Sequence, residues 1–319
     1  MADVIEGKRI LITGGAGFIG STLLGRLVDR NEIVVLDNLR RNALKSSPHA
    51  NHGNITMVEG DILDIDTVRK AARGVDVVVH AAAIAGIDTV IASPVTTLRV
   101  NMLGSANVLQ AASELDSCDR VVCISTSEVF GGRAFQAHEN DNADIGPVGE
   151  PRWTYAVSKL AEEHLAVAYF QEQFLPTVVL RPFNVYGPGQ VGEGAMRNFL
   201  QRALADEPLL IYGDGSQIRA WCYVDDMVEG MLAALAHPNA VGESFNIGNS
   251  RAVSTTLGLA ETIVRATGSR SEIHMVPRQS ADIAVRIPNV SKALDMIGFE
   301  AKVGLYEGLE RTAAYLRAR

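Results

Sequence analysis

The sequence predicts an α/β fold, in which a Rossmann-type doubly wound parallel sheet is followed by a smaller C-terminal α/β substrate lobe. Two observations lead to this prediction. The chain opens with a strand, a glycine-rich turn, a helix and a second strand, and strands then continue to alternate with helices to about residue 180. Strands separated by helices form a parallel sheet that is covered on both faces. Ligands of such sheets bind beyond the carboxyl ends of the strands.

The first strand–turn–helix–strand unit extends from Lys8 to Asp37. An apolar strand at 10–12 is followed by a helix at 18–28, and the helix begins inside a run of four glycines, Gly14, Gly15, Gly17 and Gly20. Glycines allow backbone amides to approach a pyrophosphate, and the helix N-terminus offers unpaired N–H groups. Asp37 ends the next strand, 17 residues after the last glycine and near the roughly 20 expected of a dinucleotide site. This context argues against the alternative, a glycine turn in some other α/β protein.

Asp37 also predicts which dinucleotide is bound. Its carboxylate can accept hydrogen bonds from the adenosine ribose hydroxyls, and it would repel the 2′-phosphate of NADP. Arg40 and Arg41 lie close by and weaken this preference slightly. The predicted cofactor is therefore NAD.

The rest of the first half supplies the other expected elements of the sheet. Strands are predicted at 55–58, 75–79, 120–124 and 177–180, helices at 64–73, 94–114 and 155–173, and a loop at 131–151. Polar or small residues follow the strands at four places: Asp61, His80 to Ala83, Ser125 to Glu128, and Arg181 to Asn184. These segments should meet at the carboxyl edge of the sheet.

After Pro182 the pattern changes to turn-rich loops at 185–190 and 212–217. Helices are predicted at 193–206, 226–236, 255–267, 290–297 and 305–316. The predicted organisation is an NAD-binding domain over residues 1–180 and a substrate lobe over residues 181–319. No linker separates the two, so the boundary is fuzzy and strands of the second part can return to the sheet.

Composition restricts the partners and the compartment. The formal charge is −8 and no basic patch interleaved with aromatic residues appears, so nucleic acid is not an expected partner. The three cysteines (Cys118, Cys123 and Cys222) form no CxxC pair, which predicts reduced thiols in a cytoplasmic protein and no metal site. No apolar run approaches the roughly 20 residues that span a bilayer. The N-terminus lacks the apolar region of a signal peptide.

Three residues predict alcohol oxidation. Tyr155 and Lys159 are four positions apart on a predicted helix and share a face, and Thr126 ends a neighbouring strand. Removing hydride from a carbinol carbon requires a base for the hydroxyl proton. A nearby ammonium group would lower the pKa of a tyrosine from its usual value of about 10, and Thr126 can hold the substrate oxygen. An exposed tyrosine and lysine on a helix is the alternative, since YxxxK is common by chance.

Together these motifs resemble the extended short-chain dehydrogenase/reductases, in the branch of NAD-dependent nucleotide-sugar epimerases, dehydratases and decarboxylases. The resemblance covers nearly the whole chain and rests on the segments Thr13–Gly20, His80–Ala82, Thr126–Gly131, Tyr155–Lys159, Arg181–Gly189 and Arg219–Asp226, together with Asp61 and Asn101. It implies a tightly held NAD that is reduced and then reoxidised while the sugar passes through a 4-keto form.

The resemblance also implies roles for individual residues. The expected catalytic residues are Thr126, Glu128, Tyr155 and Lys159. Expected cofactor contacts are Gly14, Gly17, Phe18, Ile19, Gly20, Asp37, Asn38, Asp61, Ile62, Ala81, Ala82, Ala83, Asn101, Tyr155 and Lys159. Expected substrate contacts are Thr126, Ser127, Asn184, Arg219 and Arg286, and the last three would hold the diphosphate of a nucleotide sugar, most simply a UDP-sugar. A surface ion pair is the alternative for either arginine.

Glu128 distinguishes the possible reactions. The Thr-Ser-Glu triplet resembles that of the 4,6-dehydratases and uronate decarboxylases, whereas simple 4-epimerases usually have a small or neutral residue in place of Glu128. A 4-ketone acidifies the C5 proton, which a carboxylate can take, and in a uronate the ketone is an electron sink for loss of carbon dioxide. A solvated loop acid is the alternative for Glu128.

One feature counts against a decarboxylase. Those enzymes usually carry an arginine where this chain has Gly189. Phe130 in place of the commoner tyrosine is a milder departure. Chemistry at C5 and C6 by a lyase is the preferred interpretation, with 4-epimerisation of UDP-glucose or UDP-glucuronate as the alternative. A non-catalytic dinucleotide sensor is more remote, because Tyr155, Lys159 and Thr126 are all present.

The predicted helices at 94–114 and 155–173 also suggest an assembly. Both are rich in small and apolar residues. Members of the family often dimerise through these two helices as a four-helix bundle, so a homodimer is expected. Packing against the sheet explains much of the same pattern.

Overall fold

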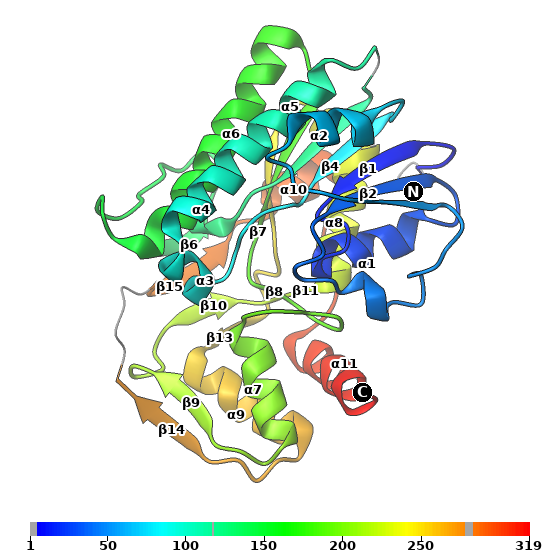
Figure 1. The fold of residues 1–319 in the computed structure, drawn as a ribbon. Coiled ribbons are helices and arrows are strands. Elements are labelled where there is room, and N and C mark those ends of the chain that lie inside the picture. Colours follow the sequence, from blue (N-terminus) through cyan, green and yellow to red (C-terminus); the bar gives the residue numbers. More distant parts are fainter. Residues whose placement is uncertain (1–4, 117, 278–282) are drawn as a thin grey trace.

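The computed structural model describes residues 5–116, 118–277 and 283–319. Its main feature is a seven-stranded sheet in which all paired neighbours are parallel, in the order β12-β7-β5-β4-β1-β2-β3 (Figure 1). The strands are β1 (Arg9–Thr13), β2 (Glu32–Asp37), β3 (Ile55–Glu59), β4 (Val77–His80), β5 (Arg120–Ile124), β7 (Thr177–Pro182) and β12 (Ser244–Ile247). The predicted fold class is therefore confirmed.

Helices cover both faces of this sheet, which is why its central strands read as apolar runs. In β1, Ile10 and Ile12 pack into the core on the face covered by α1 (Phe18–Leu27) and α8 (Val224–Ala236). Leu11 points to the opposite face, where α2 (Ile65–Ala72), α5 (Gly104–Ser113) and α6 (Thr154–Gln173) pack. The twofold alternation of a strand thus divides one apolar segment between two cores.

The helix predicted at 94–114 is interrupted. It consists of α4 (Pro94–Leu98), a π-helical segment (Arg99–Leu103) and α5. The π-helical segment contains Asn101, whose side chain is completely buried. Such segments are frequent near functional sites, because the wider turn redirects the side chains that follow it.

The second lobe is built around a four-stranded sheet in the order β13-β10-β15-β6. Its strands are β6 (Arg133–Ala137), β10 (Ile218–Ala220), β13 (Val253–Thr255) and β15 (Val285–Pro288). Two further pairs are β8 (Val185–Tyr186) with β11 (Cys222–Tyr223), and β9 (Leu209–Tyr212) with β14 (Ile273–Val276). Its helices are α7 (Ala195–Leu204), α9 (Thr256–Thr267) and α11 (Leu305–Arg317), while α10 (Ser291–Ile297) packs beside β12.

The two parts of the chain exchange elements. Strand β12 and helix α8 come from the C-terminal half but complete the first sheet, and β6 lies within the loop predicted at 131–151 but pairs with β15 of the second sheet. The short helix α3 (Ile87–Ala92) lies at the junction of the two lobes (Figure 1) and contacts the 3₁₀ helix η4 (Pro151–Trp153). A second 3₁₀ helix, η3 (Ser127–Phe130), follows β5. In the part of the chain that the structure describes, no helix combines the length and apolarity needed to cross a membrane.

Candidate active site

Two adjoining cavities open at the carboxyl end of the seven-stranded sheet. The first has a volume of about 390 Å³ and lies over the glycine-rich turn. The second, of about 310 Å³, lies beside the predicted catalytic residues. Ile19, Ala81 and Ala83 line both, so a single extended ligand can occupy the two together.

The first cavity contains most of the predicted cofactor residues. Twelve of them line it: Gly14, Gly17, Phe18, Ile19, Gly20, Asp37, Asn38, Asp61, Ile62, Ala81, Ala82 and Ala83. Gly14 has a φ of +70°, and a Cβ there would lie 2.6 Å from the amide nitrogen of Ala82. A Cβ on Gly20 would lie 2.5 Å from the Gly14 oxygen. Side chains at these positions would distort the turn, so the glycines keep backbone amides accessible as a pyrophosphate site requires.

Asp37 ends β2 at the wall of this cavity. Its carboxylate accepts hydrogen bonds from the amides of Leu39 (2.7 Å) and Ala16 (3.1 Å), and burial raises its pKa. Arg40 and Arg41 both line the cavity, and Arg41 Nη2 lies 3.6 Å from Glu193 Oε1. The charge of Arg41 is therefore already compensated, which reduces its capacity to attract a 2′-phosphate.

Asn101 is the one predicted cofactor residue that lies behind the cavities. Its amide exchanges hydrogen bonds with the backbone of Ile84, donating 3.1 Å to the carbonyl and accepting 2.8 Å from the N–H. It also donates to Ser158 Oγ at 3.0 Å. Asn101 thereby fixes the segment after β4 against helix α6, and it lines neither cavity.

The second cavity brings the predicted catalytic residues together. Thr126 follows β5, Tyr155 and Lys159 lie one turn apart on α6, and Glu128 is in η3. Ser127, Asn184 and Arg286 line the same cavity. Arg219 does not line it, but it is the register partner of Arg286 across β10 and β15.

Tyr155 differs from the sequence-based expectation. Burial raises its pKa, Glu128 and Glu162 raise it further, and a hydrogen bond with Thr126 lowers it. We expected the Lys159 ammonium group to stabilise the phenolate. Instead, Lys159 Nζ lies 2.7 Å from Glu162 Oε2, and both side chains are inaccessible to solvent or nearly so. The carboxylate compensates the lysine charge, and the phenol stays protonated in the protein alone.

Glu128 is held by two arginines. Arg152 Nη1 lies 2.6 Å from Glu128 Oε2 and Nη2 lies 3.2 Å from Oε1, while Arg286 Nη1 is 3.7 Å from Oε1. Burial opposes ionisation of Glu128, but the charges of Arg152 and Arg286, the hydrogen bond from Arg152 and the charge of Arg219 together outweigh it and lower the pKa of the carboxyl. Glu128 is therefore ionised at neutral pH, and the carboxylate with its two arginines carries a net positive charge.

Three site residues were missed by sequence reasoning. Arg152 precedes Tyr155 by three positions and Glu162 follows Lys159 by three, so helical spacing could have associated each with the site. Glu193 had no comparable signal, because it comes from a glycine-rich loop of the second lobe.

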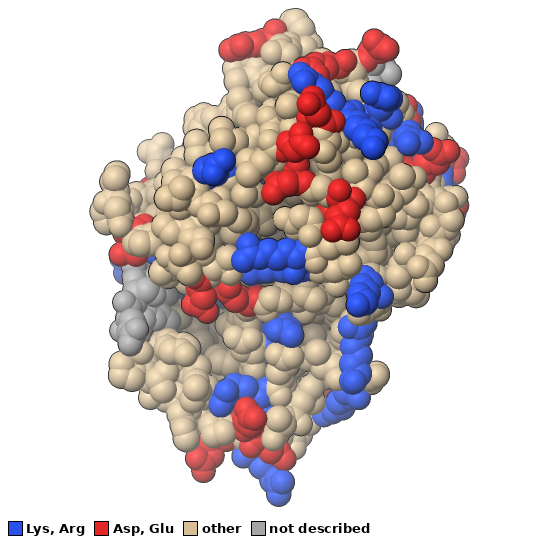
Figure 2. Space-filling view, viewed as in Figure 1, with Lys and Arg blue, Asp and Glu red and all other residues tan. Residues whose placement is uncertain are grey.

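Glu193 connects that loop to the cofactor domain. Its carboxylate accepts hydrogen bonds from the amides of Asp88 (2.8 Å) and Thr89 (3.1 Å) at the start of α3, and from the Thr89 hydroxyl. It also faces Arg41. Thr89, Arg41 and the loop residues Gln190 and Val191 all line the first cavity. Basic and acidic side chains meet on this face at the junction of the two lobes (Figure 2).

Comparison with known proteins shows which family the chain belongs to. The sequence profile described as "NAD dependent epimerase/dehydratase family" matches residues 10–248. The chain belongs to this family. It is therefore an enzyme of the NAD-dependent epimerase/dehydratase family, as its resemblance to the extended short-chain dehydrogenase/reductases predicted.

Individual members of the family are similar over nearly the whole chain. A Bacillus cytotoxicus protein named UDP-N-acetyl-alpha-D-glucosaminuronate decarboxylase is 37% identical, over 97% of this chain and 98% of its own. The structure of UDP-glucuronic acid 4-epimerase from Bacillus cereus, in complex with UDP-glucuronic acid and NAD, superimposes with a TM-score of 0.87 at 30% identity, over 97% of this chain and 99% of the other. The structure of DesIV, a dTDP-glucose 4,6-dehydratase from Streptomyces venezuelae with NAD and TYD bound, gives a TM-score of 0.87 at 30% identity, over 98% and 97%.

Proposed function

We propose that this enzyme uses NAD to decarboxylate a nucleotide-linked uronic acid, most simply a UDP-sugar, through a transient 4-keto sugar. The observation that carries the proposal is the position of Glu128 between Arg152 and Arg286 at the second cavity. One carboxylate facing two guanidinium groups leaves one positive charge uncompensated. A sugar carboxylate would neutralise that charge, whereas the neutral C6 hydroxymethyl group of a hexose would not.

The residues of the first cavity fit NAD. Glycines at which a side chain would clash adjoin the helix α1 N-terminus, and the Asp37 carboxylate lines the same cavity, where it would face the adenosine of NAD. When bound, NAD supplies a hydride acceptor and donor for C4 of the sugar. The further residues proposed to hold it are Asp61, Ile62 and Lys159, with Asn101 acting indirectly by fixing Ile84.

The chain's own groups account for the proton movements. Tyr155, as phenolate, takes the proton of the 4-hydroxyl, and Thr126 holds the same oxygen by a hydrogen bond. In the 4-keto uronate the C5–C6 bond breaks, carbon dioxide leaves, and the electron pair passes through C5 to the C4 oxygen. C5 of the resulting enolate takes up a proton, which restores the 4-ketone, and Tyr155 would return its proton to the C4 oxygen when hydride returns to C4. Arg286 binds and orients the C6 carboxylate from the cavity wall, while Arg152 holds Glu128 in place from outside the cavity.

A second candidate, 4-epimerisation, has its own supporting observation. Gly189 stands at the position where an arginine could hold a sugar carboxylate. The same Tyr155 chemistry would form a 4-ketone, and return of hydride to the other face would invert C4. Dehydration is a third outcome of the same ketone, with Glu128 taking the C5 proton.

Product mass distinguishes these outcomes. Purified protein would be incubated with UDP-glucuronate, UDP-N-acetylglucosaminuronate, UDP-glucose and dTDP-glucose, and the products analysed by mass spectrometry. Loss of carbon dioxide from a uronate is the expected result. Loss of water from a hexose would replace the proposal with dehydration, and unchanged mass with a new chromatographic peak would replace it with epimerisation.

We further propose a cytoplasmic homodimer. Cys118, Cys123 and Cys222 are all free thiols, which supports a reducing compartment. Val95 and Leu103, in α4 and the π-helical segment, are 70% and 53% exposed. Burial of these apolar side chains against a second copy would stabilise a dimer through the helices at 94–113 and α6. Light scattering of the purified protein tests this, and a monomer at micromolar concentration would contradict it.

A further inference from the structure

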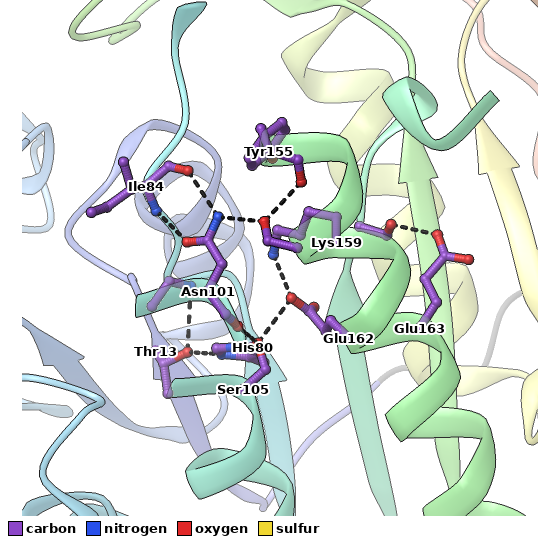
Figure 3. A network of polar contacts seen from close by, with 12 residues as sticks. Thr13, His80, Ile84, Asn101, Ser105, Tyr155, Lys159, Glu162 and Glu163 are labelled. Atoms are coloured by element: carbon purple, nitrogen blue, oxygen red, sulfur yellow. Dashed lines mark hydrogen bonds and ion pairs between the residues drawn. The ribbon is translucent and has the colours of Figure 1, made fainter. Parts of the chain in front are cut away.

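A chain of buried polar groups leads away from Lys159 into the interior (Figure 3). Lys159 Nζ contacts Glu162 Oε2 at 2.7 Å, and Ser105 Oγ donates to the same oxygen at 2.9 Å. Ser105 in turn contacts His80 Nε2 at 2.8 Å, and His80 Nδ1 contacts Thr13 Oγ1 at 2.7 Å. All five side chains are at least 99% buried. The chain therefore joins α6, α5, β4 and the last residue of β1, which precedes the glycine-rich turn.

Glu162 has an unusual position in this chain. Its Oε2 atom receives hydrogen bonds from two partners, whereas its Oε1 atom, also buried, has no partner among the described residues. A carboxylate buried with one oxygen unsatisfied is costly. Packing alone does not explain a glutamate at this buried position. This indicates that Glu162 acts through Lys159.

The other charged groups around Lys159 are engaged elsewhere or uncharged. Glu163, the next residue, is bound by Arg181 through three contacts of 2.7–3.1 Å. Burial lowers the pKa of His80 to about 3, so it is neutral, and burial of the Cys123 thiol on β5 keeps that group protonated. Glu128 is held by its arginines. Among the described residues, Glu162 is therefore the direct counter-ion of Lys159.

We propose that Glu162 is a positioning residue that sets the charge Lys159 presents to Tyr155. When Glu162 is ionised it compensates the ammonium group and keeps the phenol protonated. When Glu162 is neutral, the ammonium group acts on the phenol uncompensated and favours the phenolate. The proposal rests on the proposed function in one respect, namely that Tyr155 is the acid–base group of the reaction.

Two observations support this direction. Burial raises the pKa of Glu162, although Lys159 and Ser105 lower it, so its proton is taken up more readily than that of an exposed glutamate. Burial raises the pKa of Tyr155, and both Glu128 and Glu162 add to that effect. Removing the charge of Glu162 should therefore lower the pKa of Tyr155, while Glu128 continues to oppose ionisation.

The test is Glu162→Gln, which removes the charge and keeps the shape. In wild type and variant, the pH dependence of kcat/KM would be measured with the substrate that the product screen identifies. The ionisation of Tyr155 would be followed without substrate by ultraviolet difference titration, with Tyr155→Phe as the reference. We expect Glu162→Gln to move the acidic limb of kcat/KM and the phenol titration to lower pH by about one pH unit. Glu162→Asp, which keeps the charge, should remain close to wild type.

Glu172→Gln is the matched control, because it makes the same change at an exposed position of the same helix. It should leave both curves unchanged. Coincident curves for Glu162→Gln and wild type, or an equal movement in Glu172→Gln, would overturn the proposal. If Glu162→Gln does not fold, Ser105→Ala removes one hydrogen bond that stabilises the ionised carboxylate and should produce a smaller movement in the same direction. The titration uses no substrate, so it can fail independently of the product screen.

Discussion

Arg152 Nη1 lies 2.6 Å from Glu128 Oε2, and only the carboxylate of this pair lines the second cavity. Arg152 therefore supports Glu128 from outside the cavity, whereas Arg286 contacts the same carboxylate from the cavity wall. An anionic substrate group can compete with Glu128 for Arg286 while Arg152 keeps Glu128 in place. This relationship leads to the first two predictions.

Replacement of Arg152 should change the protonation of Glu128 and leave the second cavity open, because Arg152 does not line that cavity. Arg152→Met removes the largest of the arginine charges that lower the pKa of Glu128, so Glu128 should take up a proton at a higher pH than in wild type. Product formation should then decline on acidification over a range where wild type is unaffected. Arg152→Lys keeps a positive charge and should retain more activity. The pH profiles of the two variants check this, and identical profiles for Arg152→Met and wild type would contradict it.

Glu128→Gln should separate oxidation at C4 from the loss of carbon dioxide in the proposed reaction. The amide still fills the site but no longer forms an ion pair with Arg286, so the arginine that orients the C6 carboxylate should shift and carbon dioxide release should fall by about 100-fold or more. Oxidation at C4 depends on Tyr155 and should persist. Accumulation of the reduced-nicotinamide absorbance after substrate addition, without product, is the expected signature. Normal product formation by Glu128→Gln would show that Glu128 is a loop acid with no part in the reaction.

Tyr155→Phe should fold and retain cofactor but lose turnover by roughly 10²–10⁴-fold, because only the acid–base oxygen is removed. Tyr306, which is 48% exposed, provides the matched control Tyr306→Phe. Single-turnover reduction of the bound nicotinamide is the direct measurement. A Tyr155→Phe rate within a few fold of the control would exclude Tyr155 as the base.

Loss of the Glu193 contacts should increase the dissociation rate of NAD. Glu193→Ala removes the acceptor that joins the 189–194 loop to α3 and Arg41 across the first cavity. We expect dissociation of NAD to become about 10-fold faster, which corresponds to roughly 1.4 kcal/mol. Glu261→Ala changes an exposed glutamate of the same lobe and should have no effect. Displacement of labelled NAD measures both rates, and equal rates would show that the loop does not retain the cofactor.

Gly14→Ala should destabilise the turn itself. The φ of Gly14 is +70°, and a Cβ there would lie 2.6 Å from the Ala82 nitrogen, so alanine would be strained and would displace the chain after β4. The expected cost is roughly 1–3 kcal/mol of folding free energy together with weaker NAD binding. Gly53→Ala is the control, since a Cβ there meets nothing within 4 Å. Thermal unfolding of the two variants, each with and without NAD, checks this prediction, and equal unfolding temperatures would contradict it.

Local sequence patterns predicted the main elements of the NAD-binding half of the chain. The unit from β1 to Asp37, the helix α6 bearing Tyr155 and Lys159, and the gathering of strand ends all follow from periodicity and turn chemistry, which act over a few residues. The strands β6 and β15 escaped prediction because each is short and its partner lies about 150 residues away in the chain. Nothing near Arg133–Ala137 indicates that pairing.

The sequence by itself determined the fold class, the glycine turn, the acid at the end of β2 and the presence of a tyrosine, a lysine and a carboxylate for chemistry. Tertiary structure decided how the charges are paired: Glu128 with Arg152 and Arg286, Lys159 with Glu162, and Glu193 with Arg41 and α3. The reason is physical. Coulombic attraction and desolvation depend on distances of a few ångströms and on burial, and both are fixed by packing between segments far apart in the chain.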